Sequence, residues 1–433
     1  MKGKLISILV VLLSTQVMSF AQPQLFTVEK AAEYFKEVKA ICDRDNGKLW
    51  GMSMWVPTLF IDYGTRHLVA NEQDINDAFV RKGDVYTGKF PEDKIIANST
   101  TNLKGKSWVM VIAPLPHDSY IRNQLVIHEM FHYIQDKLGL TPAGRYDNNH
   151  MDEMEARIYL KLEWSALNKV IVAGNDSDKK NALTDALIFR AYRRQLYPNA
   201  ELSENRFEMH EGLPDYTGHK LCTSSKEELK EKLLQSAEYA WYKESYVRSF
   251  GYYSGFAYAY FLDGSDWQQH LTSDTDLAKL VQNHYNLTLP QDIEKAQEER
   301  RGLYSYQEIY DSELAFKQKK DELYAINKQK FEDGATLILS LQAPNVGFDP
   351  NNLQAFGDKG AVYPNMMLVD VWGSLMVQEG GCLLAGDWET ATVSAKNIKI
   401  NGDEVKGEGW ELKLNDGYTI VEDGSGYKMV LKK

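Results

Sequence analysis

Two histidines and a glutamate in the segment HEMFH, residues 128–132, have the residue types and the spacing of a zinc site. His128 and His132 stand four residues apart, so on a helix both imidazoles point to the same side and can bind one metal ion. Glu129 follows the first histidine and is a candidate general base. Because the motif is short, its surroundings must show that it lies on a helix.

The residues around this motif predict a helix with two different faces. Asp118 or Ser119 can cap its start, and Gly139 can end it. Gln135 shares a face with the two histidines at helical spacing. Another face carries an apolar stripe that we expect to pack against the core, formed by Ile127, Phe131, Ile134 and Leu138. The helix can therefore bury one side and present the histidines to a cleft.

A catalytic zinc ion needs a third protein ligand, and its fourth position is left for water. Glu211 is a candidate, because it belongs to a row of acids that would line one face of a helix. The members of this row, spaced at helical intervals, are Glu204, Glu208, Glu211 and Asp215. Four acids on one face normally indicate a solvated surface, but a nearby divalent cation would stabilise such a row.

The segments HEMFH and EGLPDYTG, residues 128–132 and 211–218, resemble the gluzincin zinc metallopeptidases, especially the peptidase-MA-like group. The resemblance implies that zinc is bound by His128, His132 and Glu211, and that Glu129 is the general base. The segment SFGYYSG, residues 249–255, is similar to an FAYxSG stretch of such proteins. It implies that Tyr252 donates a hydrogen bond to the oxyanion, although a packed aromatic side chain would explain Tyr252 equally well.

The chain departs from the common gluzincin spacing, which places the third ligand closer to the second histidine. Glu153 and Glu155 lie nearer to that distance, and Glu155 is the stronger rival to Glu211. Its position in the first turn of a predicted helix also suits an acid that compensates the helix dipole. His150 is a further alternative. We prefer Glu211, and interpret residues 151–200 as a helical hairpin inserted before it.

If the site is intact, peptide hydrolysis is the expected reaction. Zinc lowers the pKa of a bound water to about 7, and Glu129 would accept its proton and pass it to the leaving amine. Residues 107–113 form a predicted strand just before the metal helix and could hold an extended substrate at an exposed sheet edge. Their nearly continuous apolar character also fits a buried strand.

The first residues of the chain predict export. Lys2 and Lys4 precede an apolar run, and a cleavage site after Ala21 would give a secreted or periplasmic protein that begins at Gln22. No later stretch reaches the length of a membrane-spanning segment. The chain has three cysteines, Cys42, Cys222 and Cys382, so at most one internal disulfide is possible.

Composition and patterning predict an α+β protein with a C-terminal all-β domain. The 433 residues are 43% hydrophobic, and a net charge of −12 argues against nucleic acid as a partner. We expect a mostly helical gluzincin-like domain over 22–333, with a small sheet formed by strands in 49–69 and 107–113. From 334 onward, β-forming segments alternate with hairpin turns at 401–402, 416–417 and 423–424.

The sequence therefore predicts a secreted zinc metallopeptidase that acts on peptides or proteins, with Zn²⁺ as its cofactor. A catalytically inactive peptide- or protein-binding module on the same fold is the main alternative, and a metal-dependent hydrolase with another substrate is a lesser one. The sequence does not distinguish cleavage inside chains from cleavage at their ends.

Overall fold

The computed structural model describes residues 26–432 except 93, 95, 143–146 and 349–352. The expected signal peptide and its cleavage site lie outside the described residues. The chain folds into two compact units, each built from segments that are distant in the sequence. The first comprises Met1–Asn148, Asn199–Ala240 and Arg248–Thr288, and the second Asn149–Pro198, Trp241–Val247 and Leu289–Lys433.

A six-stranded sheet forms the N-terminal part of the first unit, in the order β3-β4-β2-β1-β6-β5. Strands β1 and β6 are parallel, and the other neighbours are antiparallel. The strands are β1 (Thr58–Asp62), β2 (His67–Ala70), β3 (Val80–Lys82), β4 (Val85–Lys89), β5 (Ser99–Leu103) and β6 (Lys106–Ala113). The prediction that 107–113 forms an exposed edge strand is wrong, because β6 lies between β1 and β5 and most of its apolar side chains are buried. The two edge strands of this sheet are β3 and β5.

Helix α1 (Val28–Asp45) packs against this sheet. Its first turn is capped by the side chain of Thr27, which accepts a hydrogen bond from the backbone N–H of Lys30. The ring of Phe35 on α1 stacks on that of Phe60 in β1 at a centroid distance of 4.0 Å. A separate apolar cluster is formed by β1, β2, β6 and the segments between them, and includes Leu59, Leu68, Trp108 and Met110.

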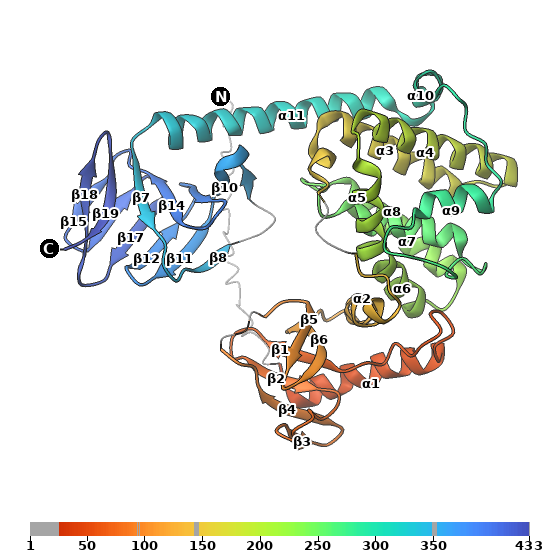
Figure 1. Cartoon of the computed structure of the whole chain (residues 1–433), viewed down its shortest axis with the longest axis horizontal. Helices are drawn as coiled ribbons and strands as arrows, with labels where there is room; N and C mark the ends of the chain where they lie inside the picture. Colours follow the sequence, from red (N-terminus) through yellow and green to blue (C-terminus); the bar gives the residue numbers. More distant parts are fainter. Residues whose placement is uncertain (1–25, 93, 95, 143–146, 349–352, 433) are drawn as a thin grey trace, which may run out of the picture. The chain divides into compact units, whose positions relative to one another are not determined.

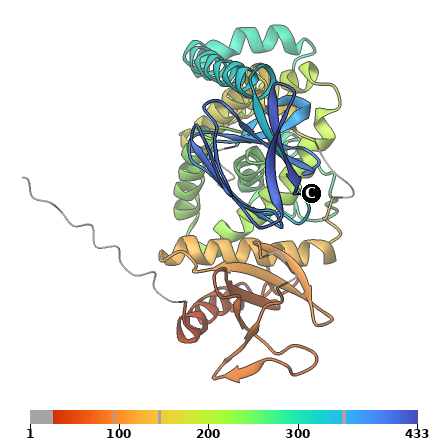
Figure 2. The same ribbon diagram turned by 90° about the vertical axis from the view of Figure 1, so that its left-hand side faces the viewer.

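The predicted metal helix is present as α2 (Ser119–Lys137). The Asp118 side chain accepts the N–H of Ile121, and Gly139 follows the helix with a φ of +70° that favours glycine. Helix α2 contacts β5 and β6 on one side and α6 on another, as Figures 1 and 2 show. The helix is therefore held between the sheet and the helices that follow it in the first unit.

The first unit continues after α2 with further helices, one of which carries Glu211. Helix α8 is almost entirely buried and contacts a short π-helix, α6 and α9. These elements are α5 (Ala200–Phe207), the π-helix η2 (Glu208–Gly212), α6 (Leu213–Cys222), α7 (Lys226–Trp241), α8 (Phe250–Leu262) and α9 (Leu277–His284), with the last residue of α7 in the second unit.

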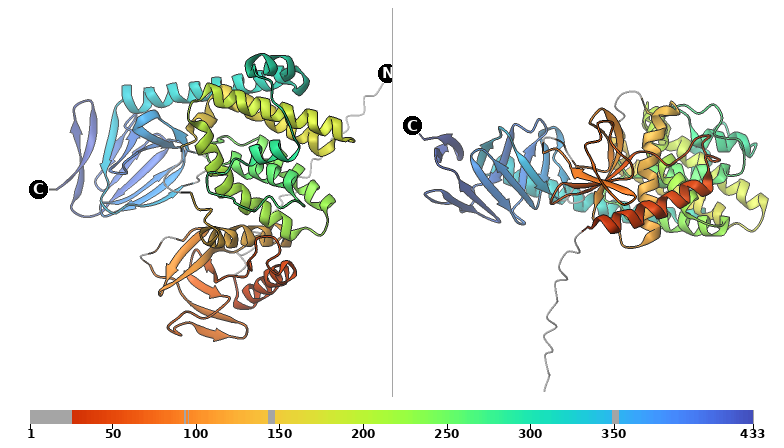
Figure 3. Two further views of the ribbon diagram at one scale, coloured as in Figure 1. Left: turned by 45° about the vertical axis from the view of Figure 1, so that its right-hand side comes forward. Right: turned by 90° about the horizontal axis from the view of Figure 1, so that it is seen from below.

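The second unit begins with a helical hairpin that covers the expected insertion at 151–200. The helices of this unit are α3 (Met154–Val172), α4 (Asp176–Leu196), α10 (Ile293–Arg301) and α11 (Tyr306–Lys328), with short helices η1 (Asn149–Asp152), η3 (Gly302–Tyr304) and η4 (Gln329–Asp333). Helix α11 lies beside α3 (Figure 3). Arg157 and Lys161 of α3 each form a 2.5 Å ion pair with the buried Glu313 of α11.

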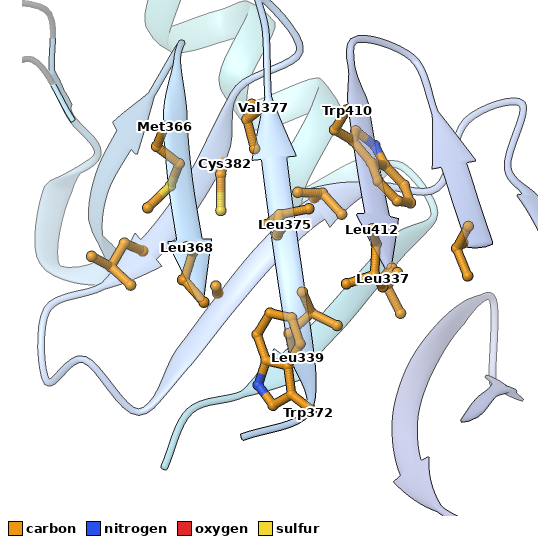
Figure 4. Close-up of a cluster of buried hydrophobic side chains, with 14 of the residues drawn as sticks. Leu337, Leu339, Met366, Leu368, Trp372, Leu375, Val377, Cys382, Trp410 and Leu412 are labelled. Atoms are coloured by element: carbon orange, nitrogen blue, oxygen red, sulfur yellow. The ribbon is translucent and has the colours of Figure 1, made fainter. Parts of the chain in front are cut away.

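The C-terminal all-β region is confirmed. Two sheets, ordered β18-β19-β7-β14-β13-β10-β9 and β15-β16-β17-β12-β11-β8, enclose one apolar core (Figure 4). The first has β7 (Thr336–Ser340), β9 (Gln354–Ala355), β10 (Gly360–Tyr363), β13 (Cys382–Ala385), β14 (Thr390–Ser394), β18 (Tyr418–Asp423) and β19 (Gly426–Leu431). The second has β8 (Asn345–Phe348), β11 (Met366–Asp370), β12 (Gly373–Val377), β15 (Lys399–Asn401), β16 (Glu404–Gly407) and β17 (Trp410–Leu414); the short helix η5 (Gly357–Lys359) precedes β10.

Two further predictions concern the cysteines and the membrane. Cys42, Cys222 and Cys382 are all free thiols, and burial raises the pKa of each to about 12. Among the described residues, helices that combine the length and the apolar character required to cross a bilayer are absent.

The buried carboxylate of Asp370 generates a prediction for the β region. It accepts the backbone N–H groups of Gln342, Ala343 and Val371 at 2.7–2.9 Å. Burial opposes ionisation of Asp370, but these hydrogen bonds lower its pKa overall. Asp370→Ala should destabilise this region by about 1–3 kcal/mol at pH 7, since three backbone N–H groups lose a charged acceptor.

Urea titrations of the full chain, read by hydrogen-exchange mass spectrometry of β7 and β11, measure this loss. Because the folded pKa is lowered, the contribution of Asp370 is present above the unfolded pKa of about 4 and disappears as the pH falls through the folded value. The matched control is Asp416→Ala, which removes an exposed acid. An equal effect of the two substitutions would contradict the assignment.

Candidate metal centre

Helix α2 brings the two motif histidines together. His128 and His132 are one helical turn apart, and their ring centroids are separated by 5.0 Å. Both side chains are largely buried, at 7% and 15% exposure. The stripe that includes Ile127, Phe131 and Ile134 is buried as expected. The buried apolar stripe predicted from the sequence is therefore confirmed, and the face that carries the histidines is largely buried as well.

Glu211 completes the group. Its Oε2 atom lies 3.4 Å from Nε2 of His128 and 3.6 Å from Nε2 of His132. One ligand atom from each of the three residues lies within 4.8 Å of the others, which is close enough for one ion to reach all three. Burial opposes the negative charge, but hydrogen bonds from the two imidazoles hold the pKa of Glu211 far below its ordinary value. The two imidazoles therefore favour the charged form of Glu211.

The backbone around Glu211 differs from the continuous helix expected from the acidic row. Residues 208–212 form a π-helix between α5 and α6, and Pro214 follows in the first turn of α6. One extra residue per turn rotates the side chains that precede the π-helix relative to those that follow it. Glu204 and Glu208 are completely buried, whereas Glu211 reaches the histidines.

A contact between glycines fixes the π-helix against α8. A methyl group placed on Gly212 would lie 2.5 Å from Cα of Gly255 and 2.7 Å from the carbonyl oxygen of Gly251. These distances are too short for any side chain, so the backbones can approach only because both helices carry glycine here. The sequence GYYSG at 251–255 places its two glycines one turn apart on the face that meets Gly212.

Asp215 lies on the other side of His128. Its Oδ1 atom is 3.8 Å from Nδ1 of His128 and accepts a 2.9 Å hydrogen bond from the Gln124 side chain. Nε2 of His219 is 3.6 Å from its Oδ2 atom. A carboxylate behind a ligand imidazole favours a proton on the nitrogen that faces it, which leaves the other nitrogen for a metal. Asp215 thus faces Nδ1 of His128 at a distance longer than a hydrogen bond, while Nε2 of the same ring faces Glu211.

Glu129 is buried beside the group. Burial raises the pKa of Glu129, and the negative charge of Glu211 adds to this effect, while the charges of His128 and His132 oppose it. A carboxyl group with a raised pKa holds a proton more readily than an exposed glutamate. This property suits a group that accepts and returns a proton during a reaction.

Tyr252 on α8 also lies at the group. Its ring is parallel to that of His128, with 5.7 Å between the centroids and 6° between the planes. Burial raises the pKa of Tyr252 far above its ordinary value, and a hydrogen bond to the charged Glu211 adds to the rise. The raised pKa favours the neutral phenol, whose O–H group can donate a hydrogen bond to Glu211.

His210 is a residue of this site that the sequence analysis did not select. Its Nε2 atom lies 3.6 Å from Oε1 of Glu211, and its ring centroid is 4.9 Å from that of His132. Burial lowers the pKa of His210, and the neighbouring histidines lower it further. Only its position directly before Glu211 could have indicated His210 as a site residue. That signal is weak, because adjacent residues on a regular helix point in different directions.

The alternative third ligands lie in the second unit. Glu155 is in the first turn of α3, where its charge acts on Tyr192 and Tyr197. Glu153 precedes this helix as its N-cap residue, and the ring of His150 packs at 5.3 Å from that of Tyr197. Within the described ranges, the group of His128, His132 and Glu211 is the one set of three such residues found close enough to share an ion.

Comparison of the chain with models of protein families, with curated proteins and with solved structures gave no significant match. The evidence for a metal site is therefore the arrangement of His128, His132 and Glu211 themselves.

Substitution of Gly212 tests whether the glycine contact positions the site. Gly212→Ala should destabilise the first unit by about 1–3 kcal/mol, because a methyl group forced into a closed contact displaces the backbone. Thermal unfolding of the full chain measures the change. Gly64→Ala is the matched control, since its added methyl group would meet only the Asp62 side chain at 3.7 Å. Unfolding temperatures that fall equally in both variants would contradict this role.

Proposed function

We propose that the chain is a zinc-dependent metallopeptidase of gluzincin type. The observation that carries this proposal is the convergence of His128, His132 and Glu211, from two elements far apart in the sequence, to within 4.8 Å of one another. A histidine pair alone is a frequent chance pattern, whereas a largely buried carboxylate that faces both imidazoles, in a cluster of groups with shifted pKa values, is a feature of functional sites.

The chemistry of the three donors suits zinc. Two imidazole nitrogens and one carboxylate oxygen are the ligand set of many catalytic zinc sites, in which a fourth position remains for water or substrate. Calcium and magnesium prefer oxygen donors, so a set with two nitrogens disfavours both ions. Asp215 supports the same assignment, because a carboxylate commonly accepts the second N–H of a ligand histidine.

A bound zinc ion would supply a Lewis acid that acidifies water and polarises a carbonyl group. Glu129, buried and with a raised pKa, would take a proton onto its carboxylate from the attacking water and return it to the leaving amine. Tyr252 would stay protonated, and its O–H group could donate a hydrogen bond to the oxygen on which negative charge develops. These roles together favour hydrolysis of an amide bond.

Strand β5 supports a peptide as the substrate. It is the edge strand of the sheet next to β6, and both β5 and β6 contact helix α2. An edge strand has unpaired backbone groups that can hold an extended chain by main-chain hydrogen bonds. We therefore move the proposed substrate strand from 107–113 to β5. The signal peptide expected at 1–21 makes the proposed enzyme an exported one.

Zinc binding tests the ligand set. The chain from Gln22 should bind one zinc ion, and Glu211→Ala should weaken binding by at least about 100-fold, since one of three protein ligands is lost. Zinc content after dialysis against a competing chelator measures this. Glu155→Ala is the matched control and should retain zinc. Loss of zinc only from Glu155→Ala would move the third ligand to α3, and a wild type without zinc would contradict the proposal.

Peptide hydrolysis tests the reaction. The zinc-loaded chain should cleave a mixed peptide library, and Glu129→Gln should lower the cleavage rate by about 10²–10⁴-fold while retaining zinc, because only the proton acceptor is removed. Mass spectrometry of the products gives both the rate and the cleaved bonds. A zinc-loaded wild type that binds peptides without cleaving them would support the binding module instead.

A further inference from the structure

We propose that Gln135 is a positioning residue that joins His132 to the π-helix carrying Glu211. This inference rests on the proposed metal site and adds a residue that controls its geometry. Gln135 lies one turn after His132 on α2, and its side chain is almost completely buried, at 1% exposure. Its amide group contacts His132 on one side and the backbone of the π-helix on the other.

The contacts of Gln135 fix the orientation of its amide group. Its nitrogen lies 2.9 Å from the carbonyl oxygen of Met209 and 3.4 Å from that of His210. Carbonyl oxygens only accept hydrogen bonds, so the atom that faces them must be the NH₂ group. The amide oxygen then faces Nδ1 of His132 at 3.0 Å. Because this oxygen only accepts, Nδ1 of His132 must carry a proton.

This proton determines which nitrogen of His132 can bind a metal. With Nδ1 donating to Gln135, Nε2 is the remaining nitrogen, and it is the atom that lies 3.6 Å from Glu211. An imidazole held at one nitrogen cannot rotate freely, so its other nitrogen has a fixed direction. Gln135 faces Nδ1 of His132 at hydrogen-bond distance, whereas the oxygen that faces Nδ1 of His128, Oδ1 of Asp215, lies at 3.8 Å.

Pro214 explains why the carbonyl groups of Met209 and His210 need a hydrogen-bond donor from outside the π-helix. Proline has no backbone N–H, so residue 214 can donate neither to the carbonyl of His210, four residues earlier, nor to that of Met209, five residues earlier. The amide nitrogen of Gln135 reaches these same two carbonyl oxygens. Buried carbonyl groups are costly to leave without donors. The Gln135 side chain therefore substitutes for the donor that Pro214 lacks.

The same amide group consequently acts on two ligands that come from different elements. It sets the ring of His132 on α2, and it holds the carbonyl groups of the two peptides that precede Glu211. A change at Gln135 should alter the distance and direction between these ligands without removing either. This distinguishes a positioning residue from one that only adds stability.

Gln135→Met tests the proposal because methionine has nearly the same length but cannot form these hydrogen bonds. Zinc affinity should fall by about 10–100-fold. The visible absorption of the cobalt-loaded chain, which reports the ligand geometry, should also shift. The matched control is Gln297→Met, which removes an equally buried amide that accepts a 2.9 Å bond from Tyr159 in the second unit. Its cobalt spectrum should not change.

A double-mutant cycle with Pro214→Ala separates the contact of Gln135 with the π-helix from its contact with His132. Alanine restores an N–H at 214 that can donate to the carbonyl of Met209 or His210, so the loss of thermal stability caused by Gln135→Met should be smaller in this background. Proton NMR of the chain labelled at histidine with ¹⁵N should show a protected proton on Nδ1 of His132 that disappears in Gln135→Met.

The outcomes distinguish this inference from the proposed function. If the wild type binds no zinc, the proposed function fails, and the NMR signal and the thermal cycle still decide the role of Gln135. If zinc binds but Gln135→Met leaves the affinity and the cobalt spectrum unchanged, the positioning role is overturned. Additive effects of Gln135→Met and Pro214→Ala would overturn the link to Pro214.

Discussion

The contact between the largely buried carboxylate of Glu211 and two imidazoles is the interaction on which the rest of this site depends. A buried charge is stable only where hydrogen bonds and opposite charge compensate it, and both histidines serve that purpose here. The carboxylate can reach them because the π-helix turns it toward α2, and the π-helix can lie there because Gly212 meets the backbone of α8. A divalent cation between the three groups would provide stronger compensation.

The local parts of this arrangement could be predicted from the sequence. The period of the apolar residues and the cap at Asp118 define α2 almost to the residue, because both signals depend on neighbours within two turns. The β-forming residues from 335 onward placed the start of the C-terminal region near the first residue of β7 for the same reason. Glu211 was selected on the residues around it, and the structure brings it to the histidines.

The parts that could not be predicted depend on contacts between distant residues. Residues 204–215 have the spacing of one regular helix, and only the packing of Gly212 on α8 and the lack of an N–H at Pro214 explain why a π-helix forms instead. Sheet order is likewise a long-range property. The strand at 107–113 would be apolar at the edge of the sheet or inside it, and its inner position follows from its pairing with β5. The carbonyl groups that Gln135 contacts, those of Met209 and His210, lie on another element, so the sequence around Gln135 carries no signal of this contact.

Zinc K-edge X-ray absorption of the chain loaded with one equivalent of zinc tests the central claim most directly, because it reports the atoms bound to the metal. The structure predicts nitrogen and oxygen ligands at about 2.0–2.1 Å, with outer scattering from two imidazoles. Glu211→Ala should change this spectrum, and Glu155→Ala should leave it as in the wild type. A spectrum without imidazole scattering, or one that Glu211→Ala does not alter, would contradict a metal centre formed by His128, His132 and Glu211.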